Sequence, residues 1–121
     1  MKIAVMGEIH EDGWKVFEDN NLESFELLNF EENNLQKELS EVDAILLRTA
    51  RLSNDVLSFC KKLKIVSRHG VGYDNVNLEY LSQNNIALGI TSTSNAVSVA
   101  EHVLTSFLYL SKNIHLSDKL T

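Results

Sequence analysis

Residues 63–75, LKIVSRHGVGYDN, place a short apolar run directly before two glycines that are one residue apart. Apolar runs of this kind are typical of strands buried on both faces of a parallel sheet. In such sheets ligands bind at the carboxyl ends of the strands, which is where Gly70 and Gly72 fall. The segment therefore predicts an α/β fold and raises the question of whether its loop is a cofactor site.

The rest of the chain repeats the same alternation of strands and helices. Apolar runs predict strands, and longer mixed segments between them predict helices. The predicted strands are 2–6, 24–28, 44–47, 63–66 and 86–90, and the predicted helices are 11–18, 31–42, 54–60 and 78–83. Alternation of this kind indicates βαβ units and a parallel sheet. We expect a flavodoxin-like α/β sandwich.

Composition narrows the class of protein. The chain of 121 residues is long enough for one packed domain, and its 44% apolar and 23% charged residues are ordinary for a globular protein. A net charge of −6 disfavours binding to nucleic acid, which needs a basic surface. The lone Cys60 excludes an intrachain disulfide, and neither a signal peptide nor a membrane-spanning run is recognisable. We therefore expect a cytoplasmic protein without a membrane or nucleic-acid partner.

The last element differs from the earlier ones. Ser98 and Glu101 have the spacing of a capping box, so we expect a helix that begins at Ser98 and runs to residue 114. Its apolar surface is wider than one sheet face requires, and it comprises Val99, Ala100, Val103, Leu104, Phe107, Leu108 and Leu110. Two interpretations stay open. The helix is either a buried terminal helix or one that presents part of this surface to another domain.

The glycine loop does not fit a dinucleotide fingerprint. That motif requires G-x-G-x-x-G, and here Asn75 stands at the third glycine position. The next strand ends without the acidic residue that binds the ribose, and the turn after the first strand carries Glu8 where a phosphate would lie.

A phospho-acceptor receiver domain is excluded because Arg48 follows the strand that should end in aspartate. The four histidines lack metal-ligand spacing, so we expect no metal site.

What the loop offers instead is a small concavity for an anion. Consecutive amides of Gly70, Val71 and Gly72 can point toward one ligand. Arg48 and Arg68 each follow or end a predicted strand, so both guanidiniums would reach this edge if the strands are parallel neighbours. The favoured ligand is a small organic carboxylate.

Simpler interpretations of the same residues stay open. The two arginines could be ordinary surface residues, and the two glycines could serve only a tight turn. Asp74 and Asn75 are better explained as loop caps than as catalytic groups, and His69 as a residue on the rim of the site.

Three segments together carry a family resemblance. Residues 44–57, AILLRTARLSNDVL, residues 63–88, LKIVSRHGVGYDNVNLEYLSQNNIAL, and residues 94–114, SNAVSVAEHVLTSFLYLSKNI, resemble the NAD-dependent D-2-hydroxyacid dehydrogenases, especially phosphoglycerate dehydrogenases. Residues 1–43 match only in the order of elements. The chain departs from the family at residues 90–92, Ile-Thr-Ser, where N-x-P is usual beside the cofactor hinge.

The resemblance implies a division of the chain and a set of roles. Residues 1–97 would form a flavodoxin-like substrate domain, and residues 98–121 a helix leading into a Rossmann domain that binds NAD. Gly70, Val71 and Gly72 would bind the substrate carboxylate with help from Arg48 and Arg68, and Val71 would also border the nicotinamide.

The family's G-x-G-x-x-G loop and its catalytic arginine, glutamate and histidine would lie beyond Thr121. Glu101 and His102 are therefore not assigned to catalysis, and this portion alone is expected to be inactive.

The sequence leaves two functions open. The first is the substrate-binding portion of an NAD-dependent dehydrogenase acting on a small 2-hydroxy or 2-oxo acid. The second is a non-catalytic anion-binding or interaction module that self-associates through residues 98–114. For a phosphorylated substrate, Arg51, Lys61 or Lys62 could supply a further cation.

Overall fold

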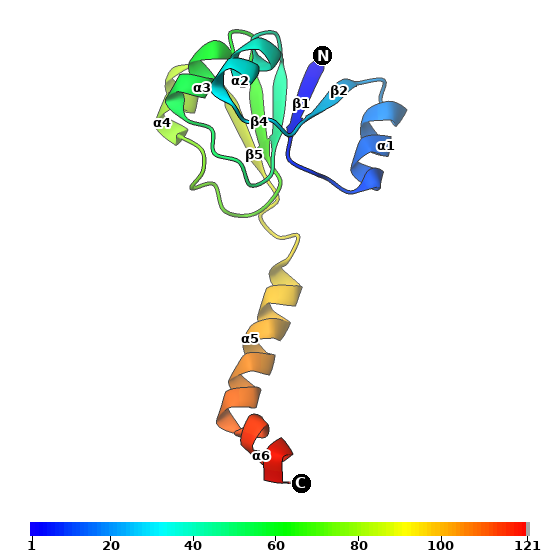
Figure 1. The fold of residues 1–121 in the computed structure, drawn as a ribbon, viewed down its shortest axis with the longest axis vertical. Helices are drawn as coiled ribbons and strands as arrows, with labels where there is room; N and C mark the ends of the chain where they lie inside the picture. Colours follow the sequence, from blue (N-terminus) through cyan, green and yellow to red (C-terminus); the bar gives the residue numbers. More distant parts are fainter. Residues whose placement is uncertain (121) are drawn as a thin grey trace. The chain divides into compact units, whose positions relative to one another are not determined.

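The computed structural model describes residues 1–120, and the centre of the fold is a sheet of five parallel strands (Figure 1). The strands are β1 (Lys2–Met6), β2 (Glu23–Leu27), β3 (Ala44–Leu47), β4 (Ile65–Arg68) and β5 (Ala87–Ile90). Their order across the sheet is β2-β1-β3-β4-β5, which is the flavodoxin-like order. The predicted α/β fold with a parallel sheet flanked by helices is confirmed.

Four helices connect these strands. They are α1 (Glu11–Asp19), α2 (Glu32–Leu39), α3 (Asn54–Phe59) and α4 (Leu78–Gln83). Helices α2, α3 and α4 lie together on one side of the sheet, whereas α1 lies beside β2 (Figure 1). Short polar side chains set two of the starts. The Ser53 hydroxyl accepts from the Val56 amide at 3.3 Å, and the Asn77 side-chain oxygen accepts from the Tyr80 amide at 3.0 Å.

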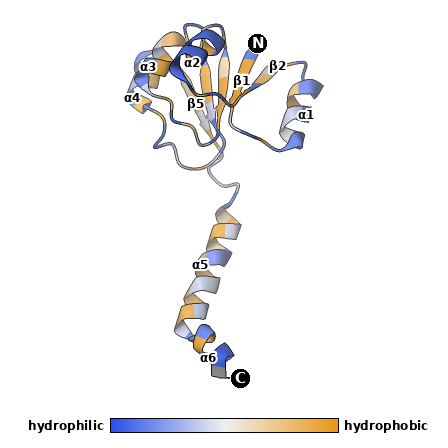
Figure 2. Ribbon diagram, viewed as in Figure 1, coloured by the Kyte–Doolittle hydropathy of each residue, from blue (hydrophilic) through white to orange (hydrophobic). Residues whose placement is uncertain are grey.

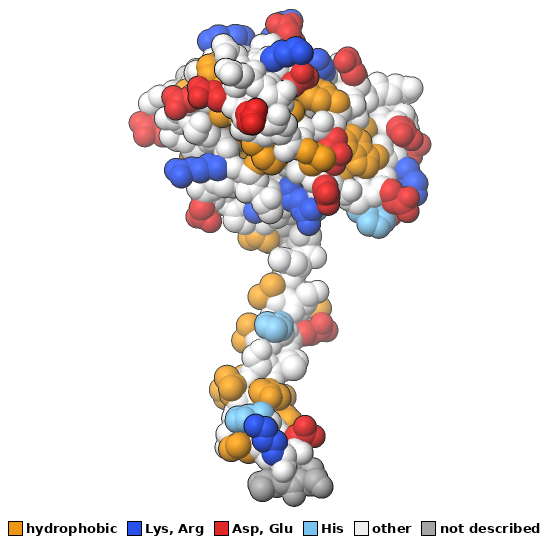
Figure 3. All heavy atoms as spheres, in the orientation of Figure 1, with side chains coloured by type: hydrophobic (Ala, Val, Ile, Leu, Met, Phe, Trp, Pro, Cys, Tyr) orange, Lys and Arg blue, Asp and Glu red, His pale blue; other side chains and the backbone are white. Residues whose placement is uncertain are grey.

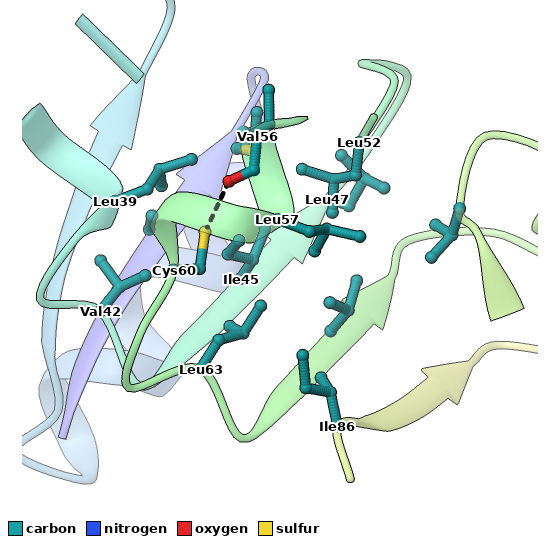
Figure 4. Close-up of a cluster of buried hydrophobic side chains, with 14 of the residues drawn as sticks. Leu39, Val42, Ile45, Leu47, Leu52, Val56, Leu57, Cys60, Leu63 and Ile86 are labelled. Atoms are coloured by element: carbon teal, nitrogen blue, oxygen red, sulfur yellow. Dashed lines mark hydrogen bonds between the residues drawn. The ribbon is translucent and has the colours of Figure 1, made fainter. Parts of the chain in front are cut away.

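The core lies between the sheet and helices α2, α3 and α4. Its strand residues are almost fully buried, and they are Ala4, Met6, Leu27, Ile45, Leu47 and Val66. Figure 2 shows the middle strands as hydrophobic, and Figure 4 shows leucine and valine side chains from the helices packed against them. Each buried leucine or isoleucine stabilises the fold by roughly 1.5–3 kcal/mol. The sheet edge that carries the loops is therefore held by a rigid base.

Cys60 belongs to this core. Its thiol donates a hydrogen bond to the Val56 carbonyl at 3.4 Å (Figure 4), and burial raises the pKa of the thiol to about 11. A thiol with such a pKa is almost entirely protonated at neutral pH, so Cys60 acts as a small apolar side chain.

One strand begins later than predicted. The apolar run at 63–66 predicted the strand there, but β4 covers Ile65–Arg68. Leu63 is buried just before the strand, and its amide donates to the Cys60 carbonyl at 3.2 Å, which closes a turn. Lys64 is held by the Asp43 carboxylate at 2.7 Å. Because the strand begins two residues late, Arg68 is its last residue rather than part of the following loop.

The contacts within the chain divide it into residues 1–91 and residues 92–121. The second unit contains α5 (Ala96–Ser111) and α6 (Ile114–Leu120). Within this unit the apolar side chains of α5 are exposed, including Leu104 and Phe107, and Figure 3 shows hydrophobic side chains along it.

The predicted start and end of the last helix are both wrong. Asn95 occupies the N-cap, and its carbonyl accepts from the Val99 amide at 2.9 Å, so Ser98 already lies inside the first turn. A hydroxyl inside the helix cannot cap its start. The helix ends at Ser111, and Asn113, with a φ of 49°, separates it from α6.

Candidate functional site

The carboxyl ends of β1, β3 and β4 form the edge that carries the predicted site. Met6 pairs with Leu47, and Leu47 pairs with Arg68, so the residues that follow these strands are neighbours. Arg48 and Arg68 reach one edge only if their strands are parallel neighbours, and β3 and β4 are parallel neighbours. The connection from β1 leads to β2 on one side of β1, and the connection from β2 leads to β3 on the other side. This reversal makes the β1/β3 boundary the switch point where ligands bind in this kind of sheet.

Arg48 lies at this switch point. One of its terminal nitrogens, Nη1, donates to the backbone carbonyl of Glu8 at 2.8 Å. Gly7 precedes that carbonyl with a φ of +104°, and a Cβ there would be 3.3 Å from the Cβ of Arg48. The glycine thus permits the close approach of the β1 loop to Arg48. The guanidinium is exposed, and its remaining N–H groups can face a ligand.

Arg68 lies folded over the glycine loop. Its Nη1 donates to the carbonyl of His69, and a Cβ at Gly70 would lie 2.9 Å from its Cζ. Its Nε is buried and has no hydrogen-bond partner within residues 1–120. A buried donor without a partner is costly, so a movement of Arg68 that brings this Nε to an acceptor would be favourable.

The three loop amides are not equivalent. The amide of Gly70 already donates to the Arg68 carbonyl at 2.9 Å, and the Gly70 carbonyl accepts from the Thr91 amide at 3.1 Å. The amides of Val71 and Gly72 make no hydrogen bond within the part of the chain that the structure describes. Two of the three predicted amide donors are therefore available, and Gly70 instead fixes the loop.

A cavity of about 220 Å³ brings part of the predicted set together. It is lined by Arg68 and Gly72 and by three residues that were not predicted to bind substrate, namely Thr49, Asp74 and Asn75. Arg48, Gly70 and Val71 do not line it. The side chain of Asn75 donates to the Ala50 carbonyl at 2.7 Å, which supports its interpretation as a structural residue. Asp74 also lines the cavity. The sequence analysis interpreted Asp74 only as a loop cap, and no signal in the sequence indicates that it lines a cavity.

The other cations proposed from the sequence lie in different places. Lys62 precedes β4 and pairs with Glu41, which precedes β3, so both are at the amino edge of the sheet. Hydrogen bonding to Glu41 raises the pKa of Lys62. Lys61 belongs to the same connection between α3 and β4. Arg51 alone follows a strand at the carboxyl edge, where it lines a larger cavity with Asp55 and Asp74.

Among the described residues, the other polar group predicted at the rim of this edge is His69. The His69 side chain is exposed and forms no ion pair within residues 1–120. No cluster of three histidine, cysteine, aspartate or glutamate side chains suited to a metal is found among the described residues. None of their helices is long and apolar enough to cross a bilayer.

Comparison with protein families gives a match over nearly the whole chain. The model described as "D-isomer specific 2-hydroxyacid dehydrogenase, catalytic domain" matches residues 3–114. The D-3-phosphoglycerate dehydrogenase of Methanocaldococcus jannaschii is 30% identical over 116 residues, which are 94% of this chain and 22% of that protein. The chain spans about a fifth of the length of the curated relatives it matches.

Comparison with solved structures shows the same fold in other proteins. The PH0520 protein from Pyrococcus horikoshii OT3 superposes with a TM-score of 0.84 at 24% identity and covers 98% of this chain and 35% of that chain. The NAD-dependent formate dehydrogenase from Staphylococcus aureus, solved in complex with NAD, superposes with a TM-score of 0.78 at 28% identity. It covers 98% of this chain and 41% of that one. The strand and helix arrangement is thus shared with these proteins.

Proposed function

We propose that this chain, which belongs to the D-isomer specific 2-hydroxyacid dehydrogenase family, is the substrate-binding portion of an NAD-dependent oxidoreductase that interconverts a D-2-hydroxy acid and a 2-oxo acid. Phosphoglycerate dehydrogenases are the relatives that support a phosphoglycerate-like substrate. The whole enzyme would carry out the oxidation, whereas these residues would hold the substrate and would be inactive alone.

The observation that carries the proposal is the group of donors at the carboxyl edge of β1, β3 and β4. The unbonded amides of Val71 and Gly72 and the buried, unpaired Nε of Arg68 are suited to a carboxylate. Gly70 would shape the loop, and Arg48 would add a second guanidinium at the switch point. Fixing the carboxylate would orient the hydroxyl-bearing carbon toward the reacting groups, and such orientation is a large part of catalysis.

The proposed cofactor is NAD, which accepts or supplies the hydride when it is bound. The described residues do not fit its pyrophosphate. The loop after β4 places the Asp74 carboxylate 3.4 Å from the Cβ position of Gly72, and the next helix begins only at Leu78. We therefore assign only the neighbourhood of Val71 to the nicotinamide side and expect the pyrophosphate loop in a separate Rossmann domain.

The domain assignment is part of the same proposal. Residues 1–97 would form the substrate domain, and residues 98–121 would belong to the segment that leads to the Rossmann domain. The division of contacts after Thr91 is consistent with a change of unit in this region. We also propose a cytoplasmic location for the protein, as the sequence predicts.

The test is a titration of the 121-residue chain with D-3-phosphoglycerate, followed by amide chemical shifts in an NMR spectrum. We expect saturable shifts at residues 69–73, and a weaker response to D-lactate, which lacks the phosphate. With NAD added, the chain alone should produce no NADH. Shifts spread evenly over the surface, or no shifts at residues 69–73, would contradict the proposal.

A second function rests on the exposed apolar side chains of α5 (Figure 3). An apolar surface of this kind favours self-association, so the chain could instead be a homo-oligomeric interaction module that binds an anion without catalysis. The double variant Leu104→Glu with Phe107→Glu distinguishes the two. If sedimentation shows an oligomer that becomes monomeric in the variant, helix α5 mediates self-association. A monomeric parent chain would contradict this second function.

A further inference from the structure

A second cavity within residues 1–91 lies next to the candidate substrate site and is separate from it. It has a volume of about 420 Å³ and lies between the segments that follow β3 and β4. This volume is within the range of about 300–1,000 Å³ that is usual for small-molecule sites. Its lining is mostly polar and includes Arg51, Asp55 and Asp74.

The two walls of this cavity are joined to each other. Leu52 and Val76 form a parallel bridge, and the Leu52 amide donates to the Asn75 carbonyl at 3.0 Å. The side chain of Asn77 donates to that of Asn54 at 2.9 Å. Leu52 and Val76 are both buried in the core. The cavity is therefore preformed and does not depend on a ligand to bring its walls together.

The charges around the cavity do not neutralise one another. The guanidinium of Arg51 and the carboxylates of Asp55 and Asp74 line the same space, yet none of them forms an ion pair or a side-chain hydrogen bond within residues 1–120. A simple anion would face two carboxylates, and a simple cation would face the guanidinium. A small molecule that carries both charges satisfies both kinds of group.

We propose that the cavity lined by Arg51, Asp55 and Asp74 binds a small amino carboxylate. Its carboxylate accepts from Arg51, and its ammonium donates to the two aspartates. One guanidinium against two carboxylates leaves a formal charge of −1, so a molecule with a second ammonium group complements the lining best.

The position of Asp74 gives this site a role in regulation. Asp74 and Asn75 line both this cavity and the smaller cavity beside Arg68 and Gly72. The Asp74 carboxylate opposes an anion at the glycine loop, and an ammonium bound from the other side neutralises it. The amino carboxylate therefore strengthens binding of the anionic substrate. This coupling rests on the proposed function, whereas binding of the amino carboxylate itself does not.

The test is an NMR titration of the 121-residue chain with L-lysine, with n-butylamine and acetate as probes of single charge. We expect saturable shifts at residues 51–55 and 74–77 with L-lysine and weaker binding of either single-charge probe. Arg51→Gln and Asp55→Asn should each weaken L-lysine binding by about tenfold. The matched controls Lys37→Gln and Asp19→Asn change the same charges on exposed parts of α2 and α1 and should bind normally.

Two outcomes would overturn the inference. One is the absence of saturable shifts in this cavity while the spectrum remains that of a folded chain. The other is unchanged affinity in both Arg51→Gln and Asp55→Asn. The coupling is measured by titrating D-3-phosphoglycerate with and without saturating L-lysine, and we expect an affinity increase of about fivefold or more. If L-lysine binds and D-3-phosphoglycerate does not, the proposed substrate fails and the new site stands.

Discussion

Arg48 donates a hydrogen bond through Nη1 to the backbone carbonyl of Glu8, and the 2.8 Å contact joins residues that are 40 positions apart in the chain. It connects the end of β3 to the first loop after β1 at the switch point of the sheet. The same guanidinium is the cation proposed to face the substrate carboxylate. Arg48 thus has a structural partner on one side and a proposed ligand on the other, and this arrangement needs a branched, planar donor group.

Replacing Arg48 with lysine should therefore weaken anion binding although the charge is kept. An ammonium lacks the planar fork that bonds the Glu8 carbonyl on one side and a carboxylate bidentately on the other, so we expect about a tenfold loss of D-3-phosphoglycerate affinity in a titration. The reverse exchange Lys37→Arg, on the exposed side of α2, is the control and should leave affinity unchanged. Equal affinity in Arg48→Lys and the parent chain would remove Arg48 from the site.

Gly7→Ala should destabilise the fold. The φ of +104° is unfavourable for any residue with a Cβ, and that Cβ would approach the Cβ of Arg48 to 3.3 Å. We expect the free energy of unfolding to fall by about 1–3 kcal/mol in a urea titration. The contrasting variant is Gly13→Ala in α1, where the backbone is helical and the only close neighbour is the flexible end of Ile9. A similar loss in both variants would show that the φ of Gly7 is unimportant.

Asp43 should make stability depend on pH in the acid range. Lys64 donates to its carboxylate, and so does the backbone amide of Lys2, and together they hold the pKa of Asp43 below its ordinary value. A carboxyl with a lowered pKa in the folded state stabilises the protein above its unfolded pKa of about 4. That contribution is lost as the pH falls through the folded value. Asp43→Asn should therefore lower the urea midpoint at neutral pH, and the difference from the parent should shrink in acid. A difference that stays constant with pH would exclude this linkage.

Cys60 should be unreactive in the folded chain. Its pKa of about 11 leaves at neutral pH a thiolate fraction lower than that of a free cysteine by about a hundredfold or more, and only 6% of the residue is exposed. An aromatic disulfide reagent should therefore modify Cys60 slowly in buffer and rapidly in urea. Comparable rates under both conditions would mean that the region around α3 opens readily.

The sequence was most informative where a strand is buried on both faces. The runs at 2–6 and 44–47 coincide with β1 and β3 because all residues of these strands except Lys2 and Leu46 are buried. It was less informative at β4, whose last two residues are Ser67 and Arg68. Backbone pairing with β3 and β5, rather than apolarity, extends the strand to these residues. The helix start predicted from the capping box at Ser98 was also wrong, because the helix begins at Ala96, directly after the N-cap residue Asn95.

The candidate site could also be predicted only in part from the sequence. That Arg48 and Arg68 share one edge could be predicted, because it depends only on strand order. The contact of Arg48 with Glu8 and the position of Arg68 over Gly70 could not, because both depend on backbone angles at glycines that any residue pattern leaves open. The inclusion of Asp74 in two cavity walls likewise required the three-dimensional path of the loop.

The strand order has a consequence for how the protein is made. β1 is synthesised first, β2 pairs with one of its sides, and β3, β4 and β5 are then added one after another on the other side. No strand has to be inserted between two that are already paired. On a ribosome the nascent chain can therefore extend its sheet outward as each βα unit emerges, with β2 as one edge throughout and the newest strand as the other.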